Sequence, residues 1–179
     1  MGSAMRPFPV PLLLVLVLAL VAIYISYYFR APRNPEILQT TLRNFRLDSL
    51  HERHPIVFAD RVPPESLPGL GRAWFGTNMR TAWSIEAPAE ADAPWARNRF
   101  KYLLLDPEAP MTVVAAPPGT RMGTDGAPDP ETTTLLAIRL RENQPMILPF
   151  RWHYRFLPHK DTPVRVDGIG AHDLITYFL

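Results

Sequence analysis

The chain has no cysteine, which excludes a disulfide framework, a thiolate metal site and a cysteine nucleophile. It also has no Asn-x-Ser/Thr sequence, the acceptor for N-glycosylation. Both absences suit a domain that stays outside the secretory lumen. The formal net charge is only +2, and basic residues are interspersed with acidic ones, so no basic stripe indicates a nucleic-acid groove. We therefore expect no nucleic-acid partner.

Sequence signatures of nucleophilic and phosphate-loop enzymes are absent as well. There is no Gly-x-Ser-x-Gly, and no serine has an obvious base nearby in the sequence. Gly119, Gly123 and Gly126 do not form a phosphate loop, because no Lys-Ser/Thr follows them. We expect these glycines to lie in a loop.

A long apolar segment lies near the N-terminus, roughly from Phe8 to Phe29. It carries no charge between Arg6 and Arg30, and a helix of this length covers a hydrocarbon core of about 30 Å. Tyrosines gather at its C-terminal end, as in an interfacial aromatic belt. The alternative is a cleaved signal peptide, but the run is long for one and no small-x-small cleavage site follows. The sequence predicts a single-pass transmembrane anchor.

The distribution of arginines favours a cytosol-facing C-terminal domain. Arg6 stands before the apolar run, and four arginines follow it, at positions 30, 33, 43 and 46. The predicted organisation is an anchor over residues 1–30, a tether with a short amphipathic helix over 31–53, and a β-rich globular domain over 54–179.

The tether is predicted to be helical from Asn34 to about Leu50. Asn34-Pro35-Glu36 has the residue types of an N-cap and first turn, and Leu38, Leu42 and Phe45 follow at i, i+4 and i+7.

After His54 the pattern changes to short apolar runs separated by proline and glycine. With 21 prolines in the chain, this predicts an antiparallel β-sandwich or barrel of the jelly-roll kind, and no long crossover helix for a parallel sheet is found. The segment Ala116 to Thr134 reads as a long exposed loop. The expected strands lie at Ile56–Phe58, Ala73–Phe75, Ala82–Ile85, Tyr102–Leu105, Met111–Val114, Leu135–Leu140, Met146–Leu148, Trp152–Phe156 and Val164–Val166.

The order of these segments resembles the cupin-like, Jumonji-C-like family of double-stranded β-helix proteins, which includes iron- and 2-oxoglutarate-dependent oxygenases. The resemblance covers about residues 54 to 170. Its most specific part is a late Pro-x-x-Trp hairpin, matched by the segment Leu140 to Tyr154. Shorter matches are His54-Pro55-Ile56-Val57-Phe58 to an early strand, the segment Trp74 to Ile85 to the strand that carries the HxD ligands, and the segment Lys101 to Pro107 to a lysine-containing strand.

The metal ligands that this resemblance implies are missing. A facial triad needs two imidazoles and a carboxylate on one face. Trp83-Ser84-Ile85 stands where the first ligand pair belongs, and Tyr154 stands where the last histidine belongs. His153 is one residue away, which in a strand turns its side chain to the opposite face. We therefore predict no catalytic residue, no cofactor and no metal.

The other histidines are predicted to be surface, capping or turn residues and not metal ligands. His159-Lys160-Asp161 is the only literal HxD, but it follows Pro158 after the hairpin and is predicted to be a solvated turn. His51 and His54 are interpreted as surface or capping residues rather than metal ligands.

Four tryptophans are predicted to fill the interior of the sandwich, with an apolar pocket or a partner surface as the alternative. They are Trp74, Trp83, Trp95 and Trp152.

These features lead to a non-catalytic, membrane-anchored structural or adaptor protein, because a scaffold without its ligands leaves a binding module. Its partners would be the lipid bilayer and other proteins of a membrane-associated assembly. Small single-pass proteins of large DNA viruses resemble it in type, which makes a minor virion component between an internal membrane and a capsid the most concrete form. The alternatives are a membrane-tethered cupin-type enzyme, either an oxygenase or a sugar-modifying enzyme with an unconventional site, and a small-molecule sensor.

Overall fold

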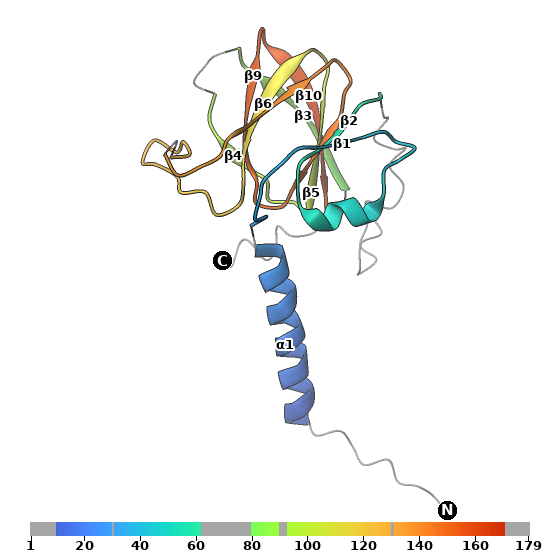
Figure 1. Ribbon diagram of the computed structural model, residues 1–179, viewed down its shortest axis with the longest axis vertical. Coiled ribbons are helices and arrows are strands. Elements are labelled where there is room, and N and C mark those ends of the chain that lie inside the picture. Colours follow the sequence, from blue (N-terminus) through green and yellow to red (C-terminus); the bar gives the residue numbers. More distant parts are fainter. Residues whose placement is uncertain (1–9, 30, 62–79, 90–92, 130, 171–179) are drawn as a thin grey trace, which may run out of the picture. The chain divides into compact units, whose positions relative to one another are not determined.

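The structure is a computed structural model that describes residues 10–29, 31–61, 80–89, 93–129 and 131–170 (Figure 1). The chain divides into two compact units, Met1–Arg30 and Ala31–Leu179. The expected strand at Ala73–Phe75, and Trp74 with it, lies outside the described residues.

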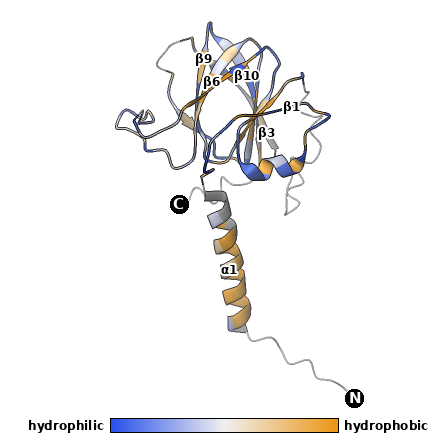
Figure 2. Cartoon of the chain, in the orientation of Figure 1, coloured by the Kyte–Doolittle hydropathy of each residue, from blue (hydrophilic) through white to orange (hydrophobic). Residues whose placement is uncertain are grey.

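The first unit contains one helix, α1, which spans Val10–Phe29 and is coloured as hydrophobic over most of its length in Figure 2. The large apolar side chains from Leu12 to Ile23 are exposed within the chain. The side chains of the expected aromatic belt lie outside the described residues. In the part of the chain that the structure describes, no helix has both the length and the hydropathy set for a membrane span. By this criterion the prediction of a transmembrane anchor is wrong, and the prediction of a membrane localisation, which depended on the anchor, is wrong as well.

The second unit is mainly β, as the short proline-bounded runs predict. Its described residues form two sheets, one with the strand order β1-β2-β8-β5-β10-β3 and one with the order β4-β9-β6-β7. We name them sheet A and sheet B. All strand pairs are antiparallel except β1 with β2. The bounds are β1 Leu38–Thr40, η1 (a 3-10 helix) Leu47–Glu52, β2 Ile56–Phe58, β3 Arg80–Ala87, β4 Ala96–Arg97, β5 Tyr102–Pro107, β6 Met111–Ala116, β7 Leu136–Leu140, β8 Met146–Pro149, β9 His153–Pro158 and β10 Thr162–Ile169.

The main core lies between the two sheets. Alternate residues of each strand point into it, for example Leu103 and Leu105 of β5, Val164 and Val166 of β10, and Val113 of β6. These side chains are almost completely buried. The alternation fixes the register, because a shift of one residue would turn each apolar set to the other face.

A second, smaller core covers the outer face of sheet A. Leu104 of β5 and Ile147 of β8 point to this face, and Leu42, Phe45 and Leu50 from the N-terminal segment are part of the same cluster. Sheet A is therefore buried on both faces at its centre. This explains why β5 is apolar at consecutive positions rather than at alternate ones.

The predicted amphipathic helix from Asn34 to Leu50 is wrong. The segment instead forms β1, a turn and η1. Leu38 donates its backbone N–H to the carbonyl of Pro55 at 2.9 Å, and the turn after β1 is tied by the Asp60 carboxylate, which accepts the N–H of Leu42 at 3.1 Å. The apolar residues that suggested a helix pack against sheet A, and this tertiary contact outweighs local helix propensity.

The prediction of a late hairpin is wrong about the pairing of its two strands and correct about the alternation of side chains in the second strand. β8 belongs to sheet A and β9 to sheet B, so the two strands do not pair, and the turn at Phe150 and Arg151 carries the chain from one sheet to the other. The predicted alternation is confirmed: Trp152, Tyr154 and Phe156 are buried in the main core, while His153 and Arg155 point to the other face and are half-buried.

We expect Trp152→Ala to lower the free energy of unfolding by roughly 3–5 kcal/mol, because a fully buried indole is replaced by a cavity. The change also leaves the carbonyl of Arg53 without the indole N–H, which it accepts at 3.0 Å. Urea denaturation of the whole chain measures the effect. His153→Ala, on the other face of the same strand, should cost under about 1 kcal/mol. Equal, small losses for both variants would contradict this placement of the core.

Candidate functional site

The turn between β8 and β9 is clamped by one buried side chain, Asn98. Its Nδ2 donates to the carbonyls of Leu148 at 2.8 Å and Pro149 at 2.9 Å, and its Oδ1 accepts the N–H of Phe100 at 2.8 Å. All three polar positions of the amide are used, so the side chain satisfies backbone groups that the turn leaves open. We name Asn98 and the turn 148–152 the corner.

Backbone hydrogen bonds complete the corner. Arg151 donates its N–H to the Asn98 carbonyl at 2.9 Å, and Asn98 donates its own to the Trp152 carbonyl at 2.8 Å. Arg151 has a φ of 66°, in the left-handed region that a residue with a Cβ rarely adopts. The corner therefore fixes the positions of the residues at the ends of β4 and β8 and at the starts of β5 and β9.

On the inner face, the positions of the missing family ligands are occupied by aromatic and aliphatic side chains. Trp83 and Ile85 on β3 pack against the main core and are only partly buried, because β3 is an edge strand of sheet A. Tyr154 lies on β9, which contacts β3 across the sandwich. Among the described residues, no three His, Asp or Glu side chains come together as a metal site.

The Tyr154 phenol is the polar group of this inner face. The residue is 7% exposed, and burial raises its pKa above the ordinary value of 10.0. Within the described ranges its hydroxyl has no hydrogen-bond partner. Its ring contacts that of Phe156 edge-on at 5.4 Å. The hydroxyl oxygen is not one of the completely buried polar atoms that lack a partner, so it is reached by solvent although the ring is buried.

An aromatic pair stands at the β3 edge of the inner face. The rings of Trp83 and Phe100 lie 5.4 Å apart at 37°, within the range of favourable aromatic contacts. Phe100 lies over Gly168 of β10, where an added Cβ would come within 2.6 Å of the ring. Glycine at position 168 therefore lets the Phe100 ring approach the sheet, next to the half-exposed Trp83.

The outer face of sheet B is cationic. Arg97 on β4 pairs directly with His153 on β9, and Arg155 follows on the same face, with its guanidinium 5.3 Å from the Trp95 ring. Arg139 lies two strands away on β7. The residues of β4, β6, β7 and β9 include no aspartate or glutamate. This concentration is invisible in the sequence, because residues 97, 139 and 155 come together only through sheet pairing.

Burial, together with repulsion between cationic groups on this face, lowers two pKa values. Burial lowers the pKa of His153 below its ordinary value of 6.5, and the charges of Arg97 and Arg151 lower it further. Burial and the charge of Arg97 also lower the pKa of Arg151. Arg151 nevertheless stays charged at neutral pH, whereas His153 is neutral there.

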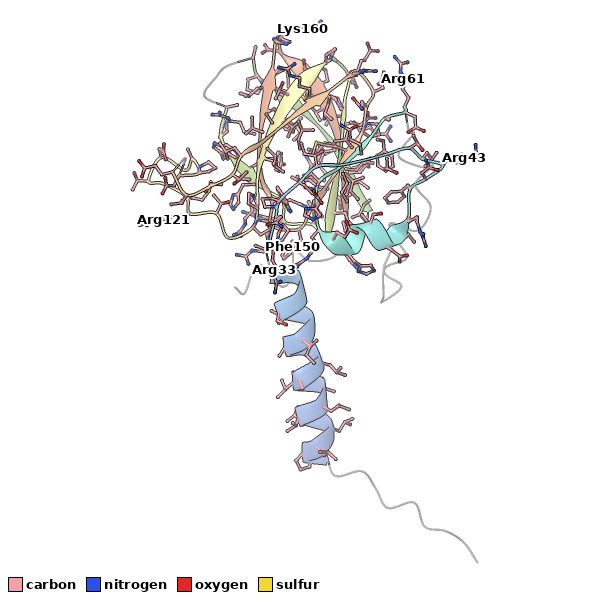
Figure 3. The ribbon with its side chains drawn as sticks, in the orientation of Figure 1. Arg33, Arg43, Arg61, Arg121, Phe150 and Lys160 are labelled. Carbon is pink, nitrogen blue, oxygen red and sulfur yellow. The ribbon has the colours of Figure 1, made fainter. Side chains whose placement is uncertain are left out.

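The remaining histidines and the HxD sequence lie apart from both faces. His159-Lys160-Asp161 forms an exposed turn between β9 and β10, as predicted, and Asp161 accepts the N–H of Ala89 at 2.8 Å. Figure 3 shows Lys160 and Phe150 at opposite ends of the domain. His54 accepts the N–H of Glu36 at 3.4 Å, and His51 lies on η1.

The predicted roles of the tryptophans and of the lysine-containing strand are modified by the structure. Trp95 is not in the core but stacks against Arg155 on the outer face of sheet B. Lys101 immediately precedes β5, is almost fully buried, and places its ammonium 5.6 Å from the Tyr102 ring. Burial lowers the pKa of Lys101.

No family model and no curated protein matches the sequence. Similar solved structures include HEPD of Streptomyces albus with 2-hydroxyethylphosphonate and Fe(II) bound, at 13% identity and a TM-score of 0.38 over 72% of this chain and 31% of that one. RmlC of Streptococcus suis in complex with dTDP-D-xylose matches at 10% identity and a TM-score of 0.34, over 65% and 61%. The dTDP-4-dehydrorhamnose 3,5-epimerase of Elizabethkingia anophelis matches at 13% and 0.31, over 64% and 65%.

These three proteins are cupin-fold enzymes, the class that the sequence resemblance implies. None is a viral structural protein, and nothing in them supports a membrane adaptor, so the predictions of a non-enzyme and of a virion component are corrected. This chain spans about a third of the first protein and less than two thirds of the others. With TM-scores below 0.5, the similarities assign no activity to it.

We expect Asn98→Ala to lower the free energy of unfolding by roughly 2–4 kcal/mol, because it removes three buried hydrogen bonds, two to carbonyls and one from an N–H. Asn44→Ala, in an exposed turn, is the matched control and should change stability by less than about 0.5 kcal/mol. Chemical denaturation compares the two. A corner that tolerates alanine as well as the exposed turn does would contradict the role given to Asn98.

Replacing Arg97 by glutamine should raise the pKa of His153 towards 6.5, because one of its two repelling charges is removed. A histidine with a lowered pKa in the folded state makes the protein less stable as the pH falls below the unfolded value of about 6.5. The variant should therefore lose less stability on acidification than the wild type. NMR titration of the His153 ring measures the pKa, and an unchanged value would show that the two side chains do not interact.

Proposed function

We propose that the β domain is a sugar-modifying enzyme of the cupin type whose substrate binds on the inner face, between β3 and β9. The observation that carries this proposal is the Tyr154 hydroxyl. The Tyr154 ring is buried in the main core, while its hydroxyl oxygen is reached by solvent and has no hydrogen-bond partner among the described residues. A bound polar ligand would supply that partner.

The aromatic pair at the β3 edge suits a carbohydrate. Trp83 is half-exposed and braced by Phe100, so one ring face is held in a fixed orientation next to the core. Sugar rings carry apolar C–H faces and polar rims, and sites that bind such ligands combine aromatic walls with a few placed polar groups. Trp83 would stack against the apolar face while Tyr154 contacts an oxygen.

Tyr154 is suited to act as a proton donor rather than as a base. Because burial raises its pKa above 10.0, the phenol is protonated at neutral pH. It would donate a hydrogen bond, or its proton, to a substrate oxygen on which negative charge develops, and regain the proton from water afterwards. A neutral donor in an apolar setting stabilises such charge more than the same group in water.

The oxygenase alternative is not favoured by the residues on this face. The iron triad of the resembled family needs imidazole and carboxylate donors on the inner face, and Trp83, Ile85 and Tyr154 stand at those positions. The indole of Trp83 and the sec-butyl group of Ile85 offer no suitable ligand atom, and a protonated phenol is a poor ligand. The residues present therefore do not fit that metal site.

We expect Tyr154→Phe to retain sugar binding and to lower turnover by roughly 10²–10⁴-fold, because the ring is kept and only the proton donor is lost. The assay incubates the whole chain with a panel of nucleotide-linked and free hexoses, detects binding by saturation-transfer NMR, and detects conversion by mass spectrometry and NMR of the products. Trp83→Ala should abolish binding to the same sugars.

Trp95→Ala is the matched control, because Trp95 stacks on the outer face of sheet B and not on the inner face. It should leave binding and turnover unchanged. The proposal would be overturned if no sugar of the panel bound, or if Tyr154→Phe turned over substrate at the wild-type rate.

A further inference from the structure

We propose that the peptide group between Asp125 and Gly126 is a modification site, at which the aspartate converts to isoaspartate. The site lies in the loop between β6 and β7, so it is independent of the inner-face function. The conversion itself needs no enzyme. Its product belongs to the substrate class of enzymes that methylate the free α-carboxylate of isoaspartate.

Water is the only co-reactant that the conversion requires. The backbone nitrogen of Gly126 attacks the side-chain carboxyl carbon of Asp125, and a C–N bond forms. The hydroxyl of the protonated carboxyl group leaves with the N–H proton as water, which gives a five-membered succinimide. Water then breaks the bond between this nitrogen and the α-carbonyl carbon. The main chain now runs through the former side chain, with one extra methylene and no change in mass or charge.

A small hairpin presents this peptide group in an exposed turn. Met122 bridges to Pro128, and Gly123 donates its N–H to the Ala127 carbonyl at 2.7 Å. Gly126 donates its N–H to the Gly123 carbonyl at 3.1 Å and has a φ of 75°. These contacts define a three-residue hairpin loop that ends in a left-handed glycine. Asp125 and Gly126 are both exposed, and the loop projects from the domain at the labelled Arg121 (Figure 3).

The two glycines of the turn leave room for the ring to close. The Asp125 carboxylate accepts the N–H of Ala127 at 3.1 Å, which folds the side chain over the peptide groups that follow it. A Cβ at position 123 would come within 2.7 Å of this carboxylate, so glycine allows the side chain to lie there. A Cβ at position 126 would meet no atom within 4 Å, so the space beside the attacking nitrogen is open among the described residues. An intramolecular nucleophile held next to its electrophile has a large rate advantage.

The other Asp-Gly of the sequence, Asp167-Gly168, provides a matched comparison within the same chain. Asp167 is 1% exposed in β10, which pairs with β5 on one side and β3 on the other. The Phe100 ring also lies over Gly168. Ring closure at this position requires the strand to leave the sheet, which happens only when the domain opens. The same two residue types therefore stand in a reactive and in a protected setting.

The experiment incubates the whole chain at neutral pH and 37 °C and then digests it in acid, where isomerisation is slow. Electron-transfer mass spectrometry locates the isoaspartate, and an isoaspartyl methyltransferase quantifies it. We expect isoaspartate to accumulate at least about tenfold faster at position 125 than at position 167, because the buried site reacts only when β10 opens. In urea that unfolds the domain, the two positions should react at similar rates.

Two variants test the ring-closing step. Asp125→Asn should give isoaspartate at the same position faster than the wild type, because a neutral amide is attacked more readily than a carboxylate. Asp125→Glu keeps the charge and should give no product at position 125, because its ring would need a sixth member. Circular dichroism confirms that each variant is folded.

Two results would overturn the proposal. One is a folded chain without isoaspartate at position 125 after a time in which the urea-unfolded chain has reacted there, which would show that the hairpin protects the site. The other is an equal rate at positions 125 and 167 in the folded chain, which would show that the reaction follows global unfolding and not the exposed turn. Sugar binding is not part of either measurement, so a failure of the inner-face function leaves the result unaffected.

Discussion

The fold depends on how the chain passes from one sheet to the other, and Asn98 controls that passage. β8 lies at the centre of sheet A and β9 inside sheet B, so the turn between them crosses from one sheet to the other and is largely buried, and its backbone groups need protein partners. The Asn98 amide supplies two of these partners, to the carbonyls of Leu148 and Pro149, and its oxygen also accepts the N–H of Phe100 before β5. The asparagine side chain is suited to binding these backbone groups, because its amide offers two donors and one acceptor in one plane.

The proposed inner-face site and the cationic outer face of sheet B both depend on this corner. It holds Phe100 at the entrance to β5 and Tyr154 one residue into β9, which places the aromatic edge and the phenol on the inner face. It also fixes Arg151 and extends the β4–β9 pairing that aligns Arg97 with His153. The alternation along β9 then separates an apolar inner site from a cationic outer one, although His153 and Tyr154 are neighbours in the sequence.

The sequence predicted features that depend on local pattern and missed those that depend on pairing. Strands such as Ile56–Phe58 and Tyr102–Pro107 were predictable, because a short apolar run bounded by proline or charged residues is stable in a sandwich only as a buried strand. The structure of the segment after Asn34 was not predictable in this way. Leu38 and Phe45 pack against sheet A, and their spacing matches a helical period only by coincidence. The cationic face could not be predicted from the sequence. Arg97, Arg139 and Arg155 lie on one face only because of the order in which the strands of sheet B pair.

The central claim is that the corner is a rigid part of the domain on which the proposed inner-face site depends. Hydrogen exchange measures this directly at the N–H groups of Asn98, Phe100 and Arg151, each of which donates within the corner. We predict that these three amides exchange only through global unfolding, with the same protection as those of β5 and β10. Exchange as fast as that of the exposed loop 117–135 would show that the corner opens independently, and would contradict the account.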